Sequence, residues 1–285
     1  MKKHLFNIII TLIFLIGLSL LLYPTISDYI NARHSSQAIA DYESNISHAS
    51  AARIAQIFED AERYNQNLAT TASALYDSSK IKDYTEMLDP IGAGIMGYLD
   101  IPCINVQLPI YHGVSEGVLQ VGVGHMEGTS LPVGGANTHC IFSGHRGLPS
   151  ARLFTDLDEV NIGDTFTITV MNRLLTYQVD QIKTVLPTET DDLQIVAGKD
   201  YCTLVTCTPY GVNTHRLLVR GMRVDNPAIA PTIHVSNEAF RIDKLIVLTV
   251  VGVPMLIVLL IFLLIRSIVK KPSTESPNGK EGNKT

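Results

Sequence analysis

The chain has 285 residues, of which 46% are hydrophobic and 17% are charged, and this charged fraction is low for a wholly soluble protein. The apolar excess is concentrated in two uncharged runs, Leu5–Tyr23 and Leu245–Ile265. Each run is long enough to cross a hydrocarbon core of roughly 30 Å as a helix. The segment between them, Pro24–Lys244, has an ordinary globular composition and suffices for one well-buried domain with appended structure. This composition excludes a multi-span transporter and a free cytosolic protein.

The distribution of charge predicts how the two runs are oriented. The segment Pro24–Lys244 carries a net charge of −10, whereas the two ends together carry +5. Basic residues flank both runs on their terminal sides, so the positive-inside bias predicts cytoplasmic termini and an extracellular middle segment in a two-pass protein of the cell membrane. An acidic outer domain argues against nucleic acid as a partner. The flanking basic residues are Lys2, Lys3, Arg266, Lys270 and Lys271.

A cleaved signal peptide is the alternative to a retained N-terminal anchor. The first apolar run has 19 residues, whereas the apolar region of a signal peptide usually has about 7–15. The first Ala-x-Ala-like cleavage site, Ala38–Ala40, lies well beyond the end of this run. The sequence therefore favours a retained anchor.

The four cysteines, Cys103, Cys140, Cys202 and Cys207, leave two interpretations open. An extracellular domain of this size could pair them as two disulfides. Scattered cysteines could equally be free and buried. The sequence contains no C-x-x-C motif and no Cys/His spacing typical of zinc, so we expect no metal site and no cofactor.

Residues 35–76 are predicted to be helical. Their apolar residues recur at steps of three or four and so form one stripe, which predicts a helical hairpin that packs on the domain or stands off the membrane. This stripe is too short to favour a coiled coil. The polar segment Asp77–Gly94 contains Asp89-Pro90 and predicts a loop or a loosely packed cover. The stripe consists of Ile54, Ile57, Ala61, Tyr64 and Leu68.

From Gly97 onward the apolar residues alternate with a period of two, which indicates strands. Many short one-sided strands with little intervening helix predict a mainly β fold, and the pattern leaves a closed barrel and a sandwich both open. About eight strands are expected: Gly97–Ile101, Ile104–Tyr111, a weaker run at Val118–Val123, His139–Ser143, Thr165–Val170, Leu175–Val179, Cys202–Cys207 and Thr214–Val219.

One predicted hairpin brings a cysteine and an arginine to the same face. If Cys207 ends one strand and Thr214 begins the next, these two residues are partners and Val205 faces Arg216. Because side chains alternate along strands, Cys207 and Arg216 then become diagonal neighbours on one face. A change of register by one residue would swap the faces. The other face carries Cys202 and His215.

This pairing suits nucleophilic catalysis. A thiolate is a nucleophile, and an arginine cannot act as a base but can stabilise an oxyanion. A histidine is the usual base beside a cysteine, and the strand pattern does not choose among four of them. The alternative is structural, with Cys207 as a small core residue and Arg216 on a solvated face. The four candidate bases are His112, His125, His139 and His145.

Three segments carry a resemblance to a known family. Thr203–Cys207 reads TLVTC and, with Arg216 on the next strand, resembles the sortase signature. Ser143–Gly147 resembles the histidine segment of sortases, and Gly122–Gly135 is also similar to this family. The Thr-Pro-Tyr-Gly after the cysteine, the second apolar run and the upstream Asp-Pro resemble class C, the pilus-assembling sortases.

The resemblance implies an eight-stranded sortase-type β-barrel with an N-terminal helical segment and a lid loop, flanked by two transmembrane helices. It implies that Cys207 is the nucleophile, that His145 is the general acid/base and that Arg216 stabilises the oxyanion. The implied enzyme is a thiol transpeptidase of a Gram-positive bacterium that cleaves an LPxTG-like sorting signal between Thr and Gly. It then passes the acyl group from a thioester to a lysine amine of a pilin, without metal or cofactor.

The resemblance also implies a regulatory lid at Asp89, Pro90 and Ile91. Class C lids usually place an aromatic residue after Asp-Pro and the aspartate near the arginine. Here Ile91 takes the place of the aromatic residue, although Asp89 can still pair with Arg216. Without the resemblance, Asp89 would be interpreted as a turn residue before proline.

These expectations divide the chain into successive regions. A cytoplasmic start and anchor (1–23) precede an extracellular helical region with the lid (24–96) and the catalytic barrel (97–226). A linker (227–244), the C-terminal transmembrane helix (245–265) and a cytoplasmic tail (266–285) follow, and the polar end of this tail is expected to be disordered.

Three other functions compete with this prediction. A housekeeping-type sortase would attach surface proteins to peptidoglycan, and the second run and the lid argue against it. A non-catalytic surface module, such as a pilus subunit, would carry its own LPxTG before the C-terminal run, and Asn226–Lys244 contains none. An L,D-transpeptidase would need a His-Gly-Cys context, which Cys207 lacks.

Overall fold

The structure is a computed structural model that describes residues 2–70, 84–90, 92–226, 252–262 and 265. The chain divides into two units, residues 1–25 with 237–285 and residues 26–236. Several expectations lie outside the described residues. They concern the end of the predicted helical region and the start of the polar loop (71–83), Ile91, the linker 227–244, both ends of the second apolar run and the tail 266–285.

The N-terminal apolar run forms the start of a long helix, α1 (Lys2–Ser47), which continues through Pro24. By length and composition, α1 is apolar and long enough to cross a membrane. The hydroxyls of Thr11 and Ser19 donate to backbone carbonyls four residues earlier, which satisfies these polar groups within the helix itself. Gly252–Phe262 is also helical and apolar, but this described part is shorter than a membrane crossing.

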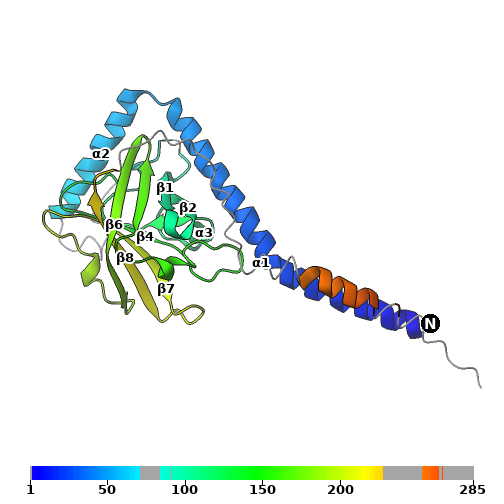
Figure 1. Cartoon of the computed structure of the whole chain (residues 1–285). Coiled ribbons are helices and arrows are strands. Elements are labelled where there is room, and N and C mark those ends of the chain that lie inside the picture. Colours follow the sequence, from blue (N-terminus) through cyan, green and yellow to red (C-terminus); the bar gives the residue numbers. More distant parts are fainter. Residues whose placement is uncertain (1, 71–83, 91, 227–251, 263–264, 266–285) are drawn as a thin grey trace, which may run out of the picture. The chain divides into compact units, whose positions relative to one another are not determined.

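In the larger unit, the second half of α1 and the helix α2 (Ala51–Thr70) flank the strands (Figure 1). The hydroxyl of Tyr42 donates to the carbonyl of Met96 at 2.9 Å and accepts from the amide of Met171 at 2.8 Å. On α2, the side chain of Asn65 bonds both the amide and the carbonyl of Leu131. The predicted helical hairpin that packs on the domain is therefore confirmed.

The buried side of α2 follows the predicted stripe. Ile57, Ala61, Tyr64 and Leu68 are buried, and Ile54 is partly buried. The break between the two helices lies at residues 48–50, where the hydroxyl of Ser50 accepts from the amide of Arg53, a typical helix N-cap contact.

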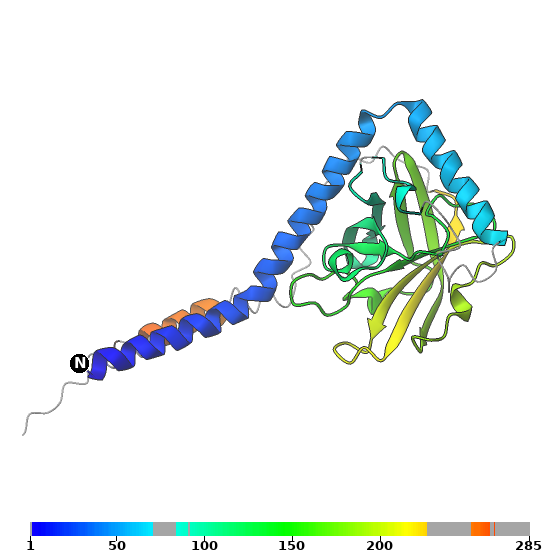
Figure 2. The same cartoon turned by 180° about the vertical axis from the view of Figure 1, so that it is seen from behind.

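Eight strands close into a barrel with the order β1-β2-β3-β4-β7-β8-β6-β5 (Figures 1 and 2). The pairs β2–β3 and β4–β7 are parallel and the other six pairs are antiparallel. Of the two architectures that the period-two pattern left open, the closed barrel is the one formed. The strands are β1 (Ile95–Ile101), β2 (Val106–His112), β3 (Val123–His125), β4 (Thr138–Ser143), β5 (Thr165–Val170), β6 (Arg173–Val185), β7 (Asp200–Thr208) and β8 (His215–Val224).

The weaker strand expected at Val118–Val123 is wrong over most of its length. A short helix, α3 (Glu116–Leu119), occupies its first two residues, turns follow, and β3 begins only at Val123. The period-two interpretation overlooked Ser115-Glu116, because a serine followed by an acidic residue is a typical start for a helical turn.

Alternation along β7 separates two apolar clusters. Cys202 and Leu204 belong to the main core inside the barrel. Val205, one position further, packs instead with Ile141, Leu193 and Leu218 in a small separate cluster, which we call the outer cluster. Cys207, two positions beyond Val205 on the same face of β7, therefore lies on the outer side of the barrel wall.

Candidate active site

The hairpin of β7 and β8 places Cys207 directly opposite Arg216. The predicted register is wrong by two residues, because Val205 faces Leu218 and Thr214 lies in the turn. Since the offset is even, the predicted faces are correct and Cys207 and Arg216 share one face. The turn closes where the amides of residues 212 and 213 both bond the carbonyl of Pro209, a detail that periodicity does not reveal.

Cys207 differs from the other cysteines in its position. All four thiols are free, so the disulfide interpretation does not hold. Cys140 and Cys202 are buried partners on β4 and β7 inside the barrel, and burial raises the pKa of the Cys140 thiol well above its usual value. Cys207 is partly exposed on the outer face. Because the thiolate is the reactive form, a partly exposed thiol opposite a cation suits a nucleophile better than a thiol buried in the core.

The segment before His145 is fixed to the strand that carries Cys207. The amide of Gly144 donates to the carbonyl of Val205 at 3.1 Å. The carbonyl of Gly144 accepts from the buried hydroxyl of Thr206 at 2.8 Å. The residue preceding the histidine is thus held by the two residues that precede the cysteine.

The segment after His145 is fixed in the same way. The guanidinium of Arg146 donates to the hydroxyl of Thr208 at 3.2 Å and forms an ion pair with Asp158. The neighbours of His145 on both sides therefore bond the neighbours of Cys207 on both sides. This arrangement brings His145 alongside Cys207, although no hydrogen bond joins the two side chains among the residues described.

Two glycines permit this close approach. A Cβ atom at Gly144 would lie 2.6 Å from the ring of Phe154, whose amide donates to the carbonyl of His145. Gly147 has a φ of +78°, and a Cβ atom there would lie 2.9 Å from the ring of Tyr210. The Gly-His-Arg-Gly run is therefore a steric requirement of the turn that carries the histidine.

The other three candidate histidines serve as structural links. His112 and His139 each bond a backbone carbonyl of a neighbouring loop, and His125 is fully buried. Burial lowers the pKa of His125 to about 4, so this imidazole is neutral at physiological pH. The contacts are His112 with the carbonyls of Met87 and Gly94, His125 with Tyr84 and the carbonyl of Ser130, and His139 with Thr203 and the carbonyl of Gln194.

The structure adds Glu116 to the site, a residue that no sequence motif indicates. Its two carboxylate oxygens lie 3.3 and 3.4 Å from Nε2 of His145. Hydrogen bonding from Gln120, followed by the charge and hydrogen bond of His145, lowers the pKa of Glu116. No sequence signal links residues 116 and 145, because the contact depends on α3 folding back beside the histidine loop.

Arg216 keeps its charge available. Its guanidinium donates to the carbonyls of Asn213 and His215, at 3.3 and 3.1 Å. Within the described part of the chain, no carboxylate forms an ion pair with Arg216. A cation whose neighbours are neutral carbonyls can still bind an oxyanion or a carbonyl oxygen.

The pair that Asp89 could form with Arg216 is not present among the described residues. The carboxylate of Asp89 accepts instead from the amides of Ala93 and Gly94, each at 3.0 Å. Gly92 and Gly94 have φ values of +69° and +70°, and this local turn directs the amides back to the aspartate. Asp89 therefore behaves here as a turn residue before Pro90, and the lid role of this segment stays a prediction.

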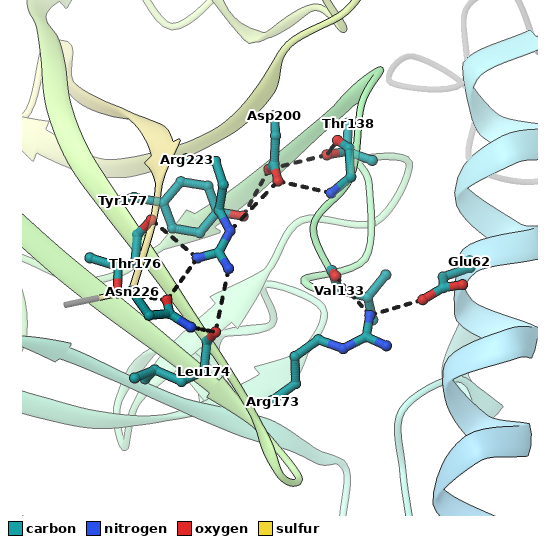
Figure 3. A network of polar contacts seen from close by, with 11 residues as sticks. Glu62, Val133, Thr138, Arg173, Leu174, Thr176, Tyr177, Asp200, Arg223 and Asn226 are labelled. Atoms are coloured by element: carbon teal, nitrogen blue, oxygen red, sulfur yellow. Dashed lines mark hydrogen bonds and ion pairs between the residues drawn. The ribbon is translucent and has the colours of Figure 1, made fainter. Parts of the chain in front are cut away.

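A second polar network lies at the opposite end of β7 (Figure 3). Asp200 accepts from the amide of Gly135, the hydroxyl of Tyr177 and the hydroxyl of Thr138, and burial raises its pKa. These bonds join the starts of β4 and β7 to β6, so the network fastens the barrel. No group of three His, Cys, Asp or Glu residues that could hold a metal ion occurs within the described ranges.

Comparison with known proteins agrees with this geometry. Residues 99–224 match the sortase domain family. Sortase C1 from Streptococcus agalactiae is 53% identical to the chain, with a TM-score of 0.64 over 67% of this chain and 100% of that structure. The sortase C1 of GBS pilus island 1 is 42% identical, with a TM-score of 0.64 over 70% of this chain and 96% of that structure.

A curated relative, sortase A from S. agalactiae, is 32% identical over 117 residues, which is 40% of this chain and 47% of that protein. The chain therefore spans about half the length of this relative, whereas it spans the solved sortase C1 structure completely. With the barrel, the Cys207–Arg216 hairpin and the anchored histidine loop, these matches show that the chain belongs to the sortase family of cysteine transpeptidases.

Proposed function

We propose that this chain is a membrane-anchored class C sortase, which cleaves an LPxTG-like sorting signal between Thr and Gly and transfers the acyl group to a pilin lysine. The observation that carries the proposal is the direct pairing of Cys207 with Arg216 beside the anchored His145. These residues combine a nucleophile, an oxyanion partner and an acid/base on one side of the barrel wall.

In the first step, the thiolate of Cys207 attacks the carbonyl carbon of the signal's threonine. Arg216 stabilises the negative charge that develops on the carbonyl oxygen. Protonated His145 donates its proton to the glycine nitrogen as the C–N bond breaks. The products are a thioester on Cys207, a free glycine amine and a neutral imidazole.

In the second step, an incoming lysine amine attacks the thioester carbon and forms the new amide bond. The C–S bond breaks and its electron pair returns to the sulfur as thiolate. Neutral His145 accepts one proton from the lysine nitrogen. Because the thioester conserves much of the peptide bond energy, the transfer requires neither a nucleotide nor a metal ion.

The pilin substrate and the membrane anchor have separate support. The similarity to the sortase C1 of GBS pilus island 1 supports a pilin as substrate. The long apolar helix α1 supports a membrane location. The basic residues at both ends of the chain favour the orientation in which the barrel is outside and both termini are cytoplasmic.

The acceptor is the point at which a pilus-assembling enzyme and a housekeeping sortase differ. We expect the full-length chain in detergent, given an LPxTG peptide, to form an isopeptide product with a lysine-containing pilin peptide. Tandem mass spectrometry locates the new bond. A peptidoglycan stem peptide is the competing acceptor, and preferential transfer to it would contradict the pilus assignment while leaving the transpeptidase intact.

A further inference from the structure

Glu116 has an unusual combination of contacts for an exposed side chain. Its carboxylate lies 3.3 Å from Nε2 of His145, although 69% of the side chain is exposed to solvent. Gln120, one turn later, donates to the same carboxylate at 3.1 Å and so limits its rotation. A carboxylate is therefore held at the solvent-facing side of the imidazole.

The charge of Glu116 is not neutralised by a permanent cation. Two other carboxylates, on the segment after His145, do have such cations. Asp158 pairs with Arg146, and Asp156 pairs with Arg152. Glu116 makes no ion pair with any lysine or arginine in the described ranges, and its one ionic partner is the imidazole of His145. After the first half-reaction this imidazole is neutral, so the carboxylate is left without a countercharge at the moment when the acceptor arrives.

The acceptor of the second half-reaction brings a positive charge to this place. A lysine amine has a pKa of about 10.4 in solution and arrives as an ammonium ion at neutral pH. To lose its proton to His145, the ammonium must come within about 3 Å of the ring. The same position lies beside the carboxylate of Glu116, because the carboxylate itself contacts the ring.

We infer that Glu116 recognises the ammonium group of the acceptor and thereby selects a cationic amine as the second substrate. This inference rests on the proposed function and deepens it, since it names the residue that distinguishes a lysine from other nucleophiles. Hydrogen bonding by Gln120 and His145 lowers the pKa of Glu116, which keeps the carboxylate charged at neutral pH.

The proton balance of the step is complete with Glu116 charged throughout. The ammonium gives one proton to neutral His145 and becomes an amine. The nitrogen lone pair forms the C–N bond, the C–S electron pair leaves on Cys207, and the second nitrogen proton passes to water. The products are the amide, the thiolate and protonated His145, which is the state that begins the next cycle.

The test compares two nucleophiles on the same acyl-enzyme of the full-length chain in detergent. Nα-acetyl-lysine amide carries an ammonium group, whereas hydroxylamine is uncharged at neutral pH. The measured quantity is the ratio of their second-order rate constants, with hydroxamate and isopeptide products separated by mass spectrometry. Because solvent screens an exposed charge pair, the expected effect is modest, and Glu116→Gln should lower the lysine-to-hydroxylamine ratio about 1.5- to fivefold.

Two further variants sharpen the result. Glu116→Asp keeps the charge and should recover part of the ratio, and added salt should reduce the wild-type ratio but have less effect on that of Glu116→Gln. Glu59→Gln removes the same charge from an exposed position on α2 and should leave the ratio unchanged.

An unchanged ratio in Glu116→Gln would overturn the inference, even if both rates fell, because Glu116 would then act only by orienting His145. Failure of the proposed function would give a different result from failure of the Glu116 inference. If the wild-type chain formed no acyl-enzyme and released no hydroxamate, the transpeptidase proposal itself would be contradicted.

Discussion

Two cysteines on β7, Cys202 and Cys207, show how much the chemistry depends on the face of a strand. Cys202 lies inside the barrel opposite Gly221, and a Cβ atom at this glycine would lie 2.7 Å from the ring of Phe166. Cys207 lies outside opposite Arg216. The same side chain is thus a packing group in one place and a candidate nucleophile in the other, because an odd separation along a strand reverses the face.

Buried His125 determines part of the acid sensitivity of the fold. Burial lowers its pKa to about 4, whereas an unfolded histidine titrates near 6.5. The unfolded chain therefore binds the proton first as the pH falls, and the stability that depends on neutral His125 is lost between about pH 6.5 and 4. The full loss is on the order of 3 kcal/mol at the lower end of this window.

This prediction is checked by urea unfolding of the barrel, followed by tyrosine fluorescence at several pH values. We expect His125→Gln to be less stable than the wild type at pH 7. Between pH 6.5 and 4, however, its unfolding free energy should fall less than that of the wild type, because glutamine does not titrate. An equal slope in the two proteins would assign the acid sensitivity to other groups.

Among the elements, the histidine loop and the β7–β8 hairpin act as one unit. Thr206 connects them through its hydroxyl bond to the carbonyl of Gly144, and it is buried between the two. Thr206→Val keeps the shape of the side chain but removes this bond. Because a small displacement of His145 costs much of the rate, we expect kcat/KM for the sorting peptide to fall about ten- to a hundredfold.

Thr203 provides the matched control on the same strand. It is equally buried, and its hydroxyl contacts His139 rather than the histidine loop. Thr203→Val should lower the thermal midpoint by an amount similar to that in Thr206→Val, with a much smaller effect on kcat/KM. Similar kinetic losses in the two variants would contradict the special role of the Thr206 bond.

For the secondary-structure elements, the sequence predicts which face of a strand each residue occupies better than it predicts where the strand ends. Alternation correctly placed Cys207 and Arg216 together, because burial of one face fixes the parity of a strand. The register was wrong because hydrogen bonds within the turn, to the carbonyl of Pro209, decide where the hairpin closes. The alternation of apolar and polar residues does not predict the contacts of Glu116 and Asp89, because both depend on how loops fold in three dimensions.

In the barrel as a whole, the two ends of β7 have different tasks. At its start, Asp200 and its partners fasten the strands β4, β6 and β7 together (Figure 3). At its end, Cys207 faces Arg216 beside the histidine loop. A site on paired strands, with its loop fixed on both sides, is held more rigidly than one on a free loop, which favours precise positioning of the thioester.

The central claim is that Cys207 becomes acylated by a sorting peptide, and intact mass spectrometry of the full-length chain tests it most directly. The chain is incubated with an LPxTG peptide without an acceptor amine, beside Cys207→Ala and Cys202→Ala. We predict an added mass equal to the peptide without its glycine-side fragment in the wild type and in Cys202→Ala, and none in Cys207→Ala. An adduct that persists in folded Cys207→Ala, or that is lost only in Cys202→Ala, would contradict the assignment of the nucleophile.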